Sequence, residues 1–416
     1  MREIIIRGGR PLEGSLDVQG AKNSVLPILA AAVLHPGQTV LRHCPRISDV
    51  AAAAAILRHL GCLVRWEGEE LVVDASRLSR WDIPDHMMRE MRSSVIFLGA
   101  VLARLGWAEI SYPGGCELGP RPIDLHLAAL GRLGAHITEK GGSLVCAAQH
   151  LRGAEITLPI PSVGATENAI LCACGAEGES VIYNAAREPE IRDLQAFLRT
   201  LGFRVRGAGT STVCVGGRAK TRDADHAVMP DRIAAATWLC AAAAAGGRIE
   251  LTNVNYRHLS TVTAALHEAG CRVRGEEGRI ELESTGRLRS IGPVRTAPYP
   301  GFPTDAQAIL MAALAGSRGA TVFVETMFSS RYRHVDELRR MGADISVADR
   351  VAVVTGVESL HGARVRCTDL RGGAALLVAA LGARGTTYIE DIRHILRGYD
   401  HPVETLAKLG ADAEMN

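Results

Sequence analysis

Aromatic residues are scarce in this chain. They make up 4% of its 416 residues, whereas 47% of the residues are hydrophobic, so the core is expected to be aliphatic and rich in alanine. An excess of one charge is also missing, because 47 basic residues stand against 45 acidic ones and leave a net charge of +2. This balance gives no general attraction to nucleic acid or to anionic membranes.

Long apolar runs are missing as well. The N-terminal sequence "MREIIIRGGRPLEG" contains an apolar run that is too short for a signal peptide. The most apolar stretches, such as "IAAATWLCAAAAAGG", fall short of a membrane span. The sequence therefore predicts a cytoplasmic protein without membrane insertion.

Paired cysteines and nucleotide motifs are absent from the sequence. Among the ten cysteines, Cys172 and Cys174 lie close together, but no second pair or histidine cluster completes a zinc site. Reduced thiols are therefore expected. The sequence has no GK dipeptide and no GxGxxG motif between a strand and a helix, which disfavours nucleotide hydrolysis and dinucleotide redox chemistry.

What the chain does contain is an internal repeat. A helix-like run that ends in glycine and leads into a strand occurs six times, and successive glycines lie 73, 68, 68, 72 and 68 residues apart. Glycine at this point suits the left-handed backbone conformation that ends a helix before a strand begins. The repeat glycines are Gly61, Gly134, Gly202, Gly270, Gly342 and Gly410.

The length of the repeat indicates the fold class. Units of about 70 residues are too long for a solenoid and favour packed α/β modules with helices covering sheets. Six units divide into three and three, with a boundary near "AVMPDRIAAATW", where Pro230 and Asp231 precede an alanine-rich helix. The sequence thus predicts two similar domains, residues 22–229 and residues 230–416 together with residues 1–21.

The second repeat unit carries extra residues. Gly106 and Gly134 are 28 residues apart, whereas the corresponding glycines of the other units are 23 to 25 residues apart. The surplus is the loop "PGGCELGPRP", residues 113–122, which contains Cys116 and Arg121. Loops held by a rigid scaffold often carry function. The alternative is a surface insertion with an incidental thiol.

Several basic residues lie in loop or glycine-rich contexts. Guanidinium groups bind carboxylate and phosphate in a bidentate way, so these arginines are candidates for one anion site. Solvated surface positions are the alternative for any single arginine. Lysine is rare, with four copies, which draws attention to the one in "VQGAKNSVLP". The candidate set is Lys22, Asn23, Arg121, Arg331, Arg371 and Arg397.

Three aspartates stand at expected helix starts or loops. In "YPGFPTDAQA", Thr304 and Gln307 form a capping-box pattern that places Asp305 in the first turn of a helix. There a carboxylate complements the helix dipole, and this pattern alone favours a structural role. Asp369 in "TDLRGG" is interpreted as a loop carboxylate that pairs with a neighbour, and Asp231 as a residue at the domain boundary.

Taken together, the motifs resemble a known family. The sequences "GAKNSVLPILAAAVL", "PGGCELGPRPIDLHL", "SVGATENAIL", "YPGFPTDAQA", "ETMFSSRYRHVDELRRMGADI" and "TDLRGGAALL" occur in this order along essentially the whole chain. The chain resembles the UDP-N-acetylglucosamine 1-carboxyvinyltransferases, which are enolpyruvyl transferases. The resemblance implies an inside-out α/β barrel of two domains, each with three βαβαββ units, and no metal or organic cofactor.

The resemblance also implies an activity and a site. The family transfers enolpyruvate from phosphoenolpyruvate to the 3′-hydroxyl of UDP-N-acetylglucosamine and releases phosphate, the first committed step of peptidoglycan synthesis. Cys116 resembles the general acid that protonates the methylene carbon, and Asp305 resembles the base or orienting group at the sugar hydroxyl. Lys22 and Arg397 complete the implied catalytic set. The implied phosphoenolpyruvate-binding residues are Lys22, Asn23, Arg121, Arg331, Arg371 and Arg397. The implied UDP-sugar residues are Arg92, Arg121, Pro122, Ile123, Asp124, Leu125, Ser162, Val163, Gly164, Asp305 and Met327, and Asp231 and Asp369 have structural or loop-orienting roles.

Three positions depart from the family pattern. Leu396 stands where an aspartate is common, Ile160 where a lysine often contacts the nucleotide, and Ser330 where asparagine is frequent. These departures leave open a non-catalytic relative that senses UDP-sugar. A shikimate 3-phosphate enolpyruvyl transferase shares the fold, but that enzyme does not depend on the cysteine of the loop.

Overall fold

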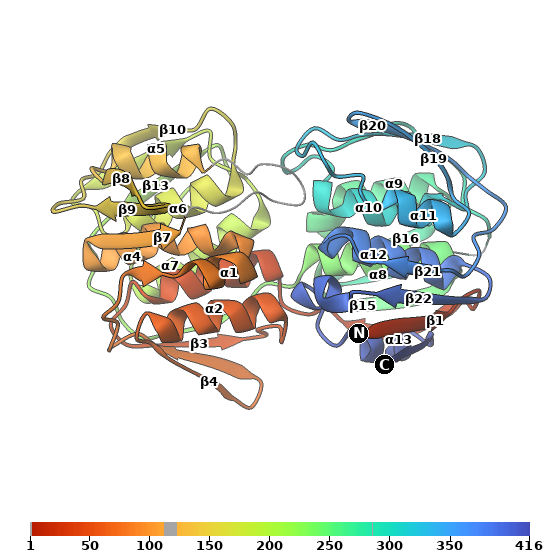
Figure 1. The fold of residues 1–416 in the computed structure, drawn as a ribbon, viewed down its shortest axis with the longest axis horizontal. Helices are drawn as coiled ribbons and strands as arrows, with labels where there is room; N and C mark the ends of the chain where they lie inside the picture. Colours follow the sequence, from red (N-terminus) through yellow and green to blue (C-terminus); the bar gives the residue numbers. More distant parts are fainter. Residues whose placement is uncertain (1, 112–122, 285) are drawn as a thin grey trace. The chain divides into compact units, whose positions relative to one another are not determined.

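The computed structural model describes residues 2–111, 123–284 and 286–416, which form two compact units (Figure 1). The central unit contains residues 20–111 and 123–229. The split unit contains residues 2–19 and 230–416, apart from residue 285. The chain therefore passes from one unit to the other next to Gln19 and again next to Pro230.

Helices and strands alternate along the central unit as the repeat predicts. Its helices are α1 (Lys22–Ala32), α2 (Ser48–His59), α3 (Asp85–Glu90), the 3-10 helix η1 (Arg92–Ile96), α4 (Phe97–Leu105), α5 (Asp124–Arg132), α6 (Val163–Ala173) and α7 (Pro189–Leu201). Its strands are β3 (Gln38–Arg42), β4 (Leu63–Glu67), β5 (Glu70–Asp74), β6 (Asp82–Ile83), β7 (Trp107–Ser111), β8 (His136–Lys140), β9 (Ser143–Ala147), β10 (Glu155–Thr157), β11 (Glu179–Tyr183), β12 (Arg204–Arg206), β13 (Thr212–Gly216) and β14 (Ala224–Ala227).

The split unit follows the same order. Its helices are α8 (Arg232–Ala245), η2 (Tyr256–Leu259), α9 (Ser260–Glu268), α10 (Thr304–Leu314), α11 (Val335–Arg340), α12 (Leu370–Gly382), η3 (Ile392–Arg397) and α13 (Pro402–Lys408). Its strands are β1 (Glu3–Arg7), β2 (Leu12–Asp17), β15 (Gly247–Asn255), β16 (Arg272–Ser284), β17 (Val294–Arg295), β18 (Ala320–Val324), β19 (Asp344–Ala348), β20 (Val351–Thr355), β21 (Arg364–Arg366), β22 (Thr386–Glu390) and β23 (Asp412–Met415).

Each unit has three small sheets in the described residues. The sheets with four strands share one pattern, in which a parallel pair is extended by two antiparallel strands, as in β10-β11-β13-β12. In the split unit, β1 pairs antiparallel with β22 and β23, and β2 pairs parallel with β15. The sheet β16-β15-β2 departs from the pattern, because the 13-residue strand β16 stands in place of the two antiparallel strands.

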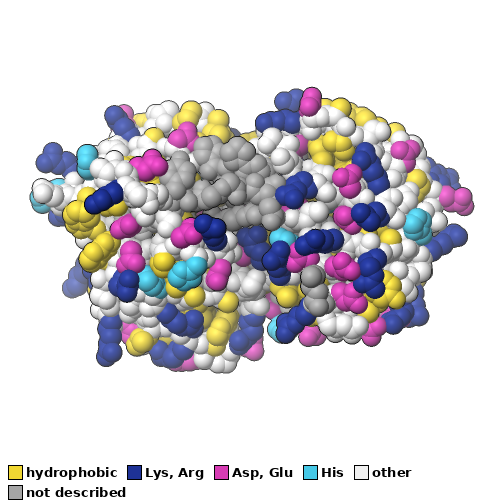
Figure 2. Space-filling view, viewed as in Figure 1, with side chains coloured by type: hydrophobic (Ala, Val, Ile, Leu, Met, Phe, Trp, Pro, Cys, Tyr) yellow, Lys and Arg dark blue, Asp and Glu magenta, His cyan; other side chains and the backbone are white. Residues whose placement is uncertain are grey.

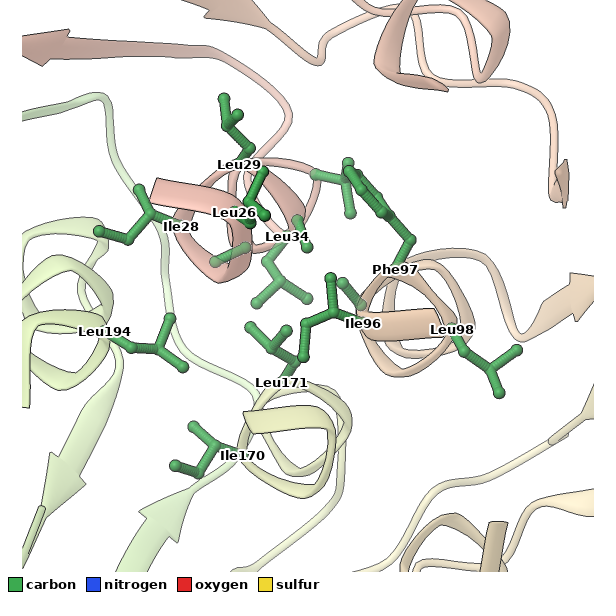
Figure 3. Close-up of a cluster of buried hydrophobic side chains, with 14 of the residues drawn as sticks. Leu26, Ile28, Leu29, Leu34, Ile96, Phe97, Leu98, Ile170, Leu171 and Leu194 are labelled. Carbon is green, nitrogen blue, oxygen red and sulfur yellow. The ribbon is translucent and has the colours of Figure 1, made fainter. Parts of the chain in front are cut away.

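The alanine-rich helices form the centre of each unit. In the split unit, α8, α10 and α12 pack against one another and are apolar nearly all round. In the central unit, α1, α4 and α6 contribute apolar side chains to one cluster, to which α7 adds Leu194 (Figure 3). Small alanine side chains let such helices approach closely, while the sheets lie outside them. The fold predicted from the sequence, an inside-out α/β barrel with three repeat units in each half, is confirmed.

The repeat glycines have the backbone conformation that the sequence predicts. All six have positive φ, from 75° at Gly410 to 108° at Gly270. At Gly202 the angle is 107°, and an added Cβ would come within 2.8 Å of the carbonyl oxygen of Lys220. A side chain at this position is therefore excluded both by conformation and by space.

Burial decides the state of most cysteines. All nine cysteines in the described residues are thiols, and eight of them are buried. Burial raises the pKa of Cys62 to about 12 and the pKa of Cys271 to about 11. Cys214 on β13 is half-buried.

The surface agrees with the balanced composition. On the face drawn in Figure 2, basic and acidic side chains are interspersed over each unit. No helix within the described residues is both long and apolar enough to cross a membrane.

Candidate active site

Lys22 is the first residue of α1 and is buried at 8% exposure. Its Nζ lies 3.0 Å from Oδ2 of Asp49, a 1% exposed residue in the first turn of α2. A buried cation at a helix N-terminus is opposed by the helix dipole and by desolvation, and the Asp49 carboxylate offsets both costs. Where a protein places a charge against a helix dipole in this way, the position is often a functional site. Asn23 follows in the same helical turn.

The N-terminus of α6 carries a second group of predicted residues in the central unit. Ser162 is the N-cap, and its Oγ accepts a hydrogen bond from the N–H of Ala165 at 3.4 Å. Val163 and Gly164 begin the helix. A Cβ on Gly164 would lie 2.9 Å from Cε1 of His126, so a larger residue would require this imidazole to shift. Ile160, where a lysine is usual, is 57% exposed.

Asn168 on α6 fixes the protonation of His126. Its Nδ2 donates to the carbonyl oxygen of Val95 and lies 2.8 Å from Nδ1 of His126, while its Oδ1 accepts from the N–H of Gly99 at 2.7 Å. Since this assigns the whole amide, Nδ1 of His126 must accept, and the proton is on Nε2. Burial lowers the pKa of His126 to about 4, although Asp124 opposes the shift.

His126 therefore connects two segments with predicted UDP-sugar residues. Ile123, Asp124 and Leu125 lie at the start of α5, which also carries His126. Ile123 is buried at 5% exposure, whereas Asp124 is exposed. The imidazole of His126 then packs against the start of α6 at Gly164.

Acid is expected to destabilise the protein through His126. In the unfolded chain this histidine binds a proton near the usual pKa of 6.5, whereas in the folded chain it does so only near pH 4. The stability that depends on neutral His126 is therefore fully present above pH 6.5 and is lost as the pH falls toward 4. Between pH 7 and pH 5 the loss from this residue amounts to about 2 kcal/mol. Thermal melts at both pH values should show a smaller acid effect in His126→Asn than in wild type. The control is His136→Asn, which changes an exposed histidine on β8. An equal acid effect in all three proteins contradicts the prediction.

Asp305 is the centre of the site in the split unit. It lies in the first turn of α10 and is 27% exposed. Its Oδ1 accepts from Arg331 at 2.8 Å and its Oδ2 accepts from Arg371 at 2.9 Å. Both arginine side chains are nearly buried, at 3% and 5% exposure. The structure thus brings three of the predicted residues together, with two arginines bound to the carboxylate of Asp305.

The electrostatics of this cluster favour charged groups. Burial acts to lower the pKa of Arg371, but Asp305, Tyr399 and Asp231 raise it well above its usual value. The guanidinium of Arg331 also donates to the carbonyl oxygen of Thr304 at 3.0 Å. Two fixed guanidinium groups beside a partly exposed carboxylate suit the binding of an anion and the orientation of a hydroxyl group.

Asp369 and Asp231 are helix N-caps in the same unit. Oδ1 of Asp369 accepts from the N–H groups of Arg371 and Gly372, at 3.0 and 3.1 Å, at the start of α12. Asp231 caps α8 in the same way at Ile233 and Ala234. Burial acts to raise the pKa of Asp369, but the Arg331 charge and the backbone N–H groups lower it overall.

The predicted capping box at α10 is wrong. The helix begins at Thr304 itself, and its N-cap is Pro303, which has no side-chain hydrogen bond. The Thr304 hydroxyl instead donates to Oε2 of Glu325 at 2.9 Å. Asp305 does lie in the first helical turn, as predicted.

Glu325 organises the turn that carries Met327. It is 1% exposed and follows β18, and its Oε1 accepts from the N–H of Met327 at 2.7 Å and of Phe328 at 3.1 Å. Met327 is 41% exposed. Arg397 ends η3 and is half-buried, and Leu396 before it is partly buried against the hydrophobic core.

Some predicted residues lie outside the described part of the chain. These are Cys116, Arg121 and Pro122. Arg92 begins η1. Lys22, Asn23 and the residues around α6 belong to the central unit, and Asp305, Met327 and the described arginines beyond residue 300 belong to the split unit.

Sequence reasoning missed four residues that hold predicted groups, two in each unit. They are polar groups that face predicted site residues or their neighbours from other elements. Glu325 directly follows the apolar strand sequence "VFV", and a carboxylate at the end of such a run is a usable signal for a buried polar partner. Asp49, Asn168 and Tyr399 gave no comparable signal. The missed residues are Asp49, Asn168, Glu325 and Tyr399.

Comparison with known proteins decides the family. The family described as EPSP synthase (3-phosphoshikimate 1-carboxyvinyltransferase) matches residues 6–406. The chain is also 46% identical over 412 residues to UDP-N-acetylglucosamine 1-carboxyvinyltransferase 2 of Caldanaerobacter subterraneus subsp. tengcongensis, covering 99% of both chains. The chain belongs to the enolpyruvyl transferase family. The resemblance seen in its motifs is thereby confirmed.

Further relatives of this enolpyruvyl transferase agree. UDP-N-acetylglucosamine 1-carboxyvinyltransferase 1 of Symbiobacterium thermophilum is 49% identical over 414 residues, which cover 98% of this chain and 93% of that protein. The enolpyruvyl transferase NikO from Streptomyces tendae superposes with a TM-score of 0.88 at 28% identity, covering 100% of this chain and 99% of NikO. EPSP synthase from Acinetobacter baumannii, at 19% identity and a TM-score of 0.75 over 100% of both chains, shares the fold.

Proposed function

We propose that this enolpyruvyl transferase moves the enolpyruvyl group of phosphoenolpyruvate to the 3′-hydroxyl of UDP-N-acetylglucosamine and releases phosphate. The observation that carries the proposal is Asp305 held between two nearly buried arginines at the start of α10. Relatives that carry the name of this activity are 42–49% identical over nearly the whole chain. The reaction begins peptidoglycan synthesis, and its substrates place the enzyme in the cytoplasm.

The reaction needs an acid, a base and fixed cations. A proton adds to the methylene carbon of phosphoenolpyruvate while the sugar oxygen bonds to its central carbon. Loss of a proton from the resulting methyl group, with departure of phosphate, restores the double bond. Cys116 supplies the first proton, and Asp305 accepts or orients the proton of the sugar hydroxyl.

Fixed cations bind the two acidic groups of phosphoenolpyruvate. Arg331 and Arg371 are preorganised by Asp305 and by the capped start of α12, so little reorganisation is needed as charge develops. Lys22, Arg121 and Arg397 are the other proposed cations, and Asn23 adds a neutral amide to the phosphoenolpyruvate-binding residues. Ser162 to Gly164, with the start of α5, hold the UDP-sugar, since free N–H groups and a positive dipole at a helix N-terminus attract phosphate.

The departures at Ile160, Leu396 and Ser330 do not favour a sensing relative. The ion-pair partners of Lys22 and Asp305, which are Asp49, Arg331 and Arg371, are not among the departing positions. The side chain of Ile160 is exposed, so the loss of a lysine there removes a surface charge and leaves the cap at Ser162 in place. A shikimate 3-phosphate enzyme is disfavoured by the cysteine loop and by the names of the relatives that are 46% and 49% identical.

Phosphate release tests the proposal. Purified protein is expected to release phosphate only when phosphoenolpyruvate and UDP-N-acetylglucosamine are both present, without added metal or nucleotide. Shikimate 3-phosphate as the acceptor is the control and should give no phosphate. Release with shikimate 3-phosphate but not with the UDP-sugar contradicts the proposal, and binding of the UDP-sugar without release favours the sensing relative.

A further inference from the structure

Tyr399 contacts Arg371, one of the two arginines that hold Asp305, and is 1% exposed. Its hydroxyl accepts from Arg371 at 3.4 Å and lies 2.7 Å from Oγ1 of Thr237. Thr237 donates its own proton to the carbonyl oxygen of Ile233 at 2.8 Å. Thr237 must therefore accept from Tyr399, so donation runs in one direction, from Arg371 to Tyr399, Thr237 and the backbone of α8. This order leaves each hydroxyl with one defined role.

Gln19 holds the backbone on both sides of Tyr399. Its Nε2 donates to the carbonyl oxygen of Gly398 at 3.0 Å, and its Oε1 accepts from the N–H of Asp400 at 2.9 Å. The carbonyl oxygen of Gln19 accepts from the N–H of Asp231 at 2.8 Å, and Asp231 caps the helix that carries Thr237. One side-chain amide thus fixes the segment 398–400 from a position about 380 residues away in sequence.

Gln19 lies where the chain crosses from one unit to the other. Gln19 is the last residue of the split unit before the chain enters the central unit, and Asp231 stands just after the chain returns. Arg397 directly precedes the segment 398–400 that Gln19 holds, and Tyr399 lies within that segment. Hydrogen bonds within the split unit therefore link Gln19, at the crossing point, to Tyr399 and through it to Arg371.

We propose that Gln19 and Tyr399 are positioning residues for phosphoenolpyruvate binding, acting through Arg371 and Arg397 without touching the substrate. The inference rests on the proposed function. Tyr399 sets the second hydrogen bond of Arg371, whose other end holds Asp305. Gln19 holds the backbone on both sides of Tyr399, at Gly398 and Asp400, and Gly398 directly follows Arg397. A displacement of about 1 Å at such groups lowers catalysis by up to about 100-fold.

Two conservative variants test the proposal. Gln19→Met keeps the size of the side chain and removes both hydrogen bonds, and Tyr399→Phe removes only the hydroxyl. Both are expected to lower kcat/KM for phosphoenolpyruvate about 10- to 100-fold, while the calorimetric affinity for UDP-N-acetylglucosamine stays within about twofold of wild type. Gln19→Glu retains the acceptor for Asp400 but turns a carboxylate oxygen toward the carbonyl oxygen of Gly398, so it should lower kcat/KM at least as much as Gln19→Met.

Gln195→Met is the matched control. Gln195 also fixes backbone through its side chain, accepting from the N–H of Ala208 at 3.0 Å, but it lies on α7 of the central unit. A merely structural role for Gln19 predicts that both methionine variants lower the melting temperature alike and leave the kinetic constants alike. That result overturns the proposal.

Crystal structures separate this proposal from the proposed function. In Gln19→Met, residues 397–400 and the Arg371 guanidinium are expected to be displaced relative to the wild-type crystal structure. If they are not displaced, the positioning role is wrong whatever the activity. If wild-type protein releases no phosphate, the proposed reaction fails, whereas a displaced segment still establishes that Gln19 positions Tyr399 and Arg371.

Discussion

Asp305→Asn is expected to lower turnover about 100- to 10,000-fold, the range over which a positioned acid or base contributes to catalysis. Its effect on stability is smaller but not negligible. A first-turn carboxylate alone contributes about 0.3–1 kcal/mol through the helix dipole. Asp305 also neutralises Arg331 and Arg371, which are nearly buried. Loss of that charge raises the expected cost to about 1–3 kcal/mol of unfolding free energy.

Asp336→Asn is the matched control for Asp305→Asn. Asp336 also lies in the first turn of a helix and pairs with an arginine, Arg339, at 2.8 Å, but its side chain is 80% exposed. Melting temperature and phosphate release are measured for both variants. Asp336→Asn should change neither by much, because exposed ion pairs contribute little. A large loss of melting temperature with near-normal turnover in Asp305→Asn returns Asp305 to a purely structural role.

Cys116 is expected to be the one cysteine that the epoxide antibiotic fosfomycin alkylates, and to react faster when UDP-N-acetylglucosamine is bound. Its thiolate attacks an epoxide carbon, the carbon–oxygen bond breaks, and the oxygen takes up a proton. The sequence places this thiol on a glycine-rich loop five residues before Arg121, where a thiolate and a phosphonate are both favoured. Loss of Cys116 as the acid in Cys116→Ser should lower turnover about 100- to 10,000-fold.

The other cysteines give the labelling its controls. Burial raises the pKa of Cys146 to about 11, and it raises the pKa of Cys172, Cys174 and Cys240 further, so these thiols stay neutral. Cys214 is the half-buried competitor. Peptide mass spectrometry should find the same single modified peptide, containing "PGGCELGPR", in wild type and in Cys214→Ser. Labelling spread over several cysteines, or no label on that peptide, identifies the loop as an ordinary surface insertion.

Local features of the chain were predictable because they depend on near neighbours. The six repeat glycines adopt positive φ, and the alanine-rich segments form helices, since a left-handed helix end and a helical run are decided within a few residues. The capping box at Thr304 failed for a reason that sequence does not contain. Glu325, 21 residues away, takes the hydroxyl that would have capped the helix.

The sequence by itself determined the six repeats, the fold class, the family resemblance and the candidate residues, including Lys22, Asp305 and Arg371. Only the tertiary structure decided the partners. It paired Asp49 with Lys22, placed Asp305 between two arginines, and joined Gln19 by hydrogen bonds to the backbone on both sides of Tyr399. Residues 66 and 379 positions apart meet here because the packing of helices brings their ends together. Backbone conformation and hydrophobic pattern are properties of short segments, whereas a hydrogen bond between distant residues exists only after those segments have packed.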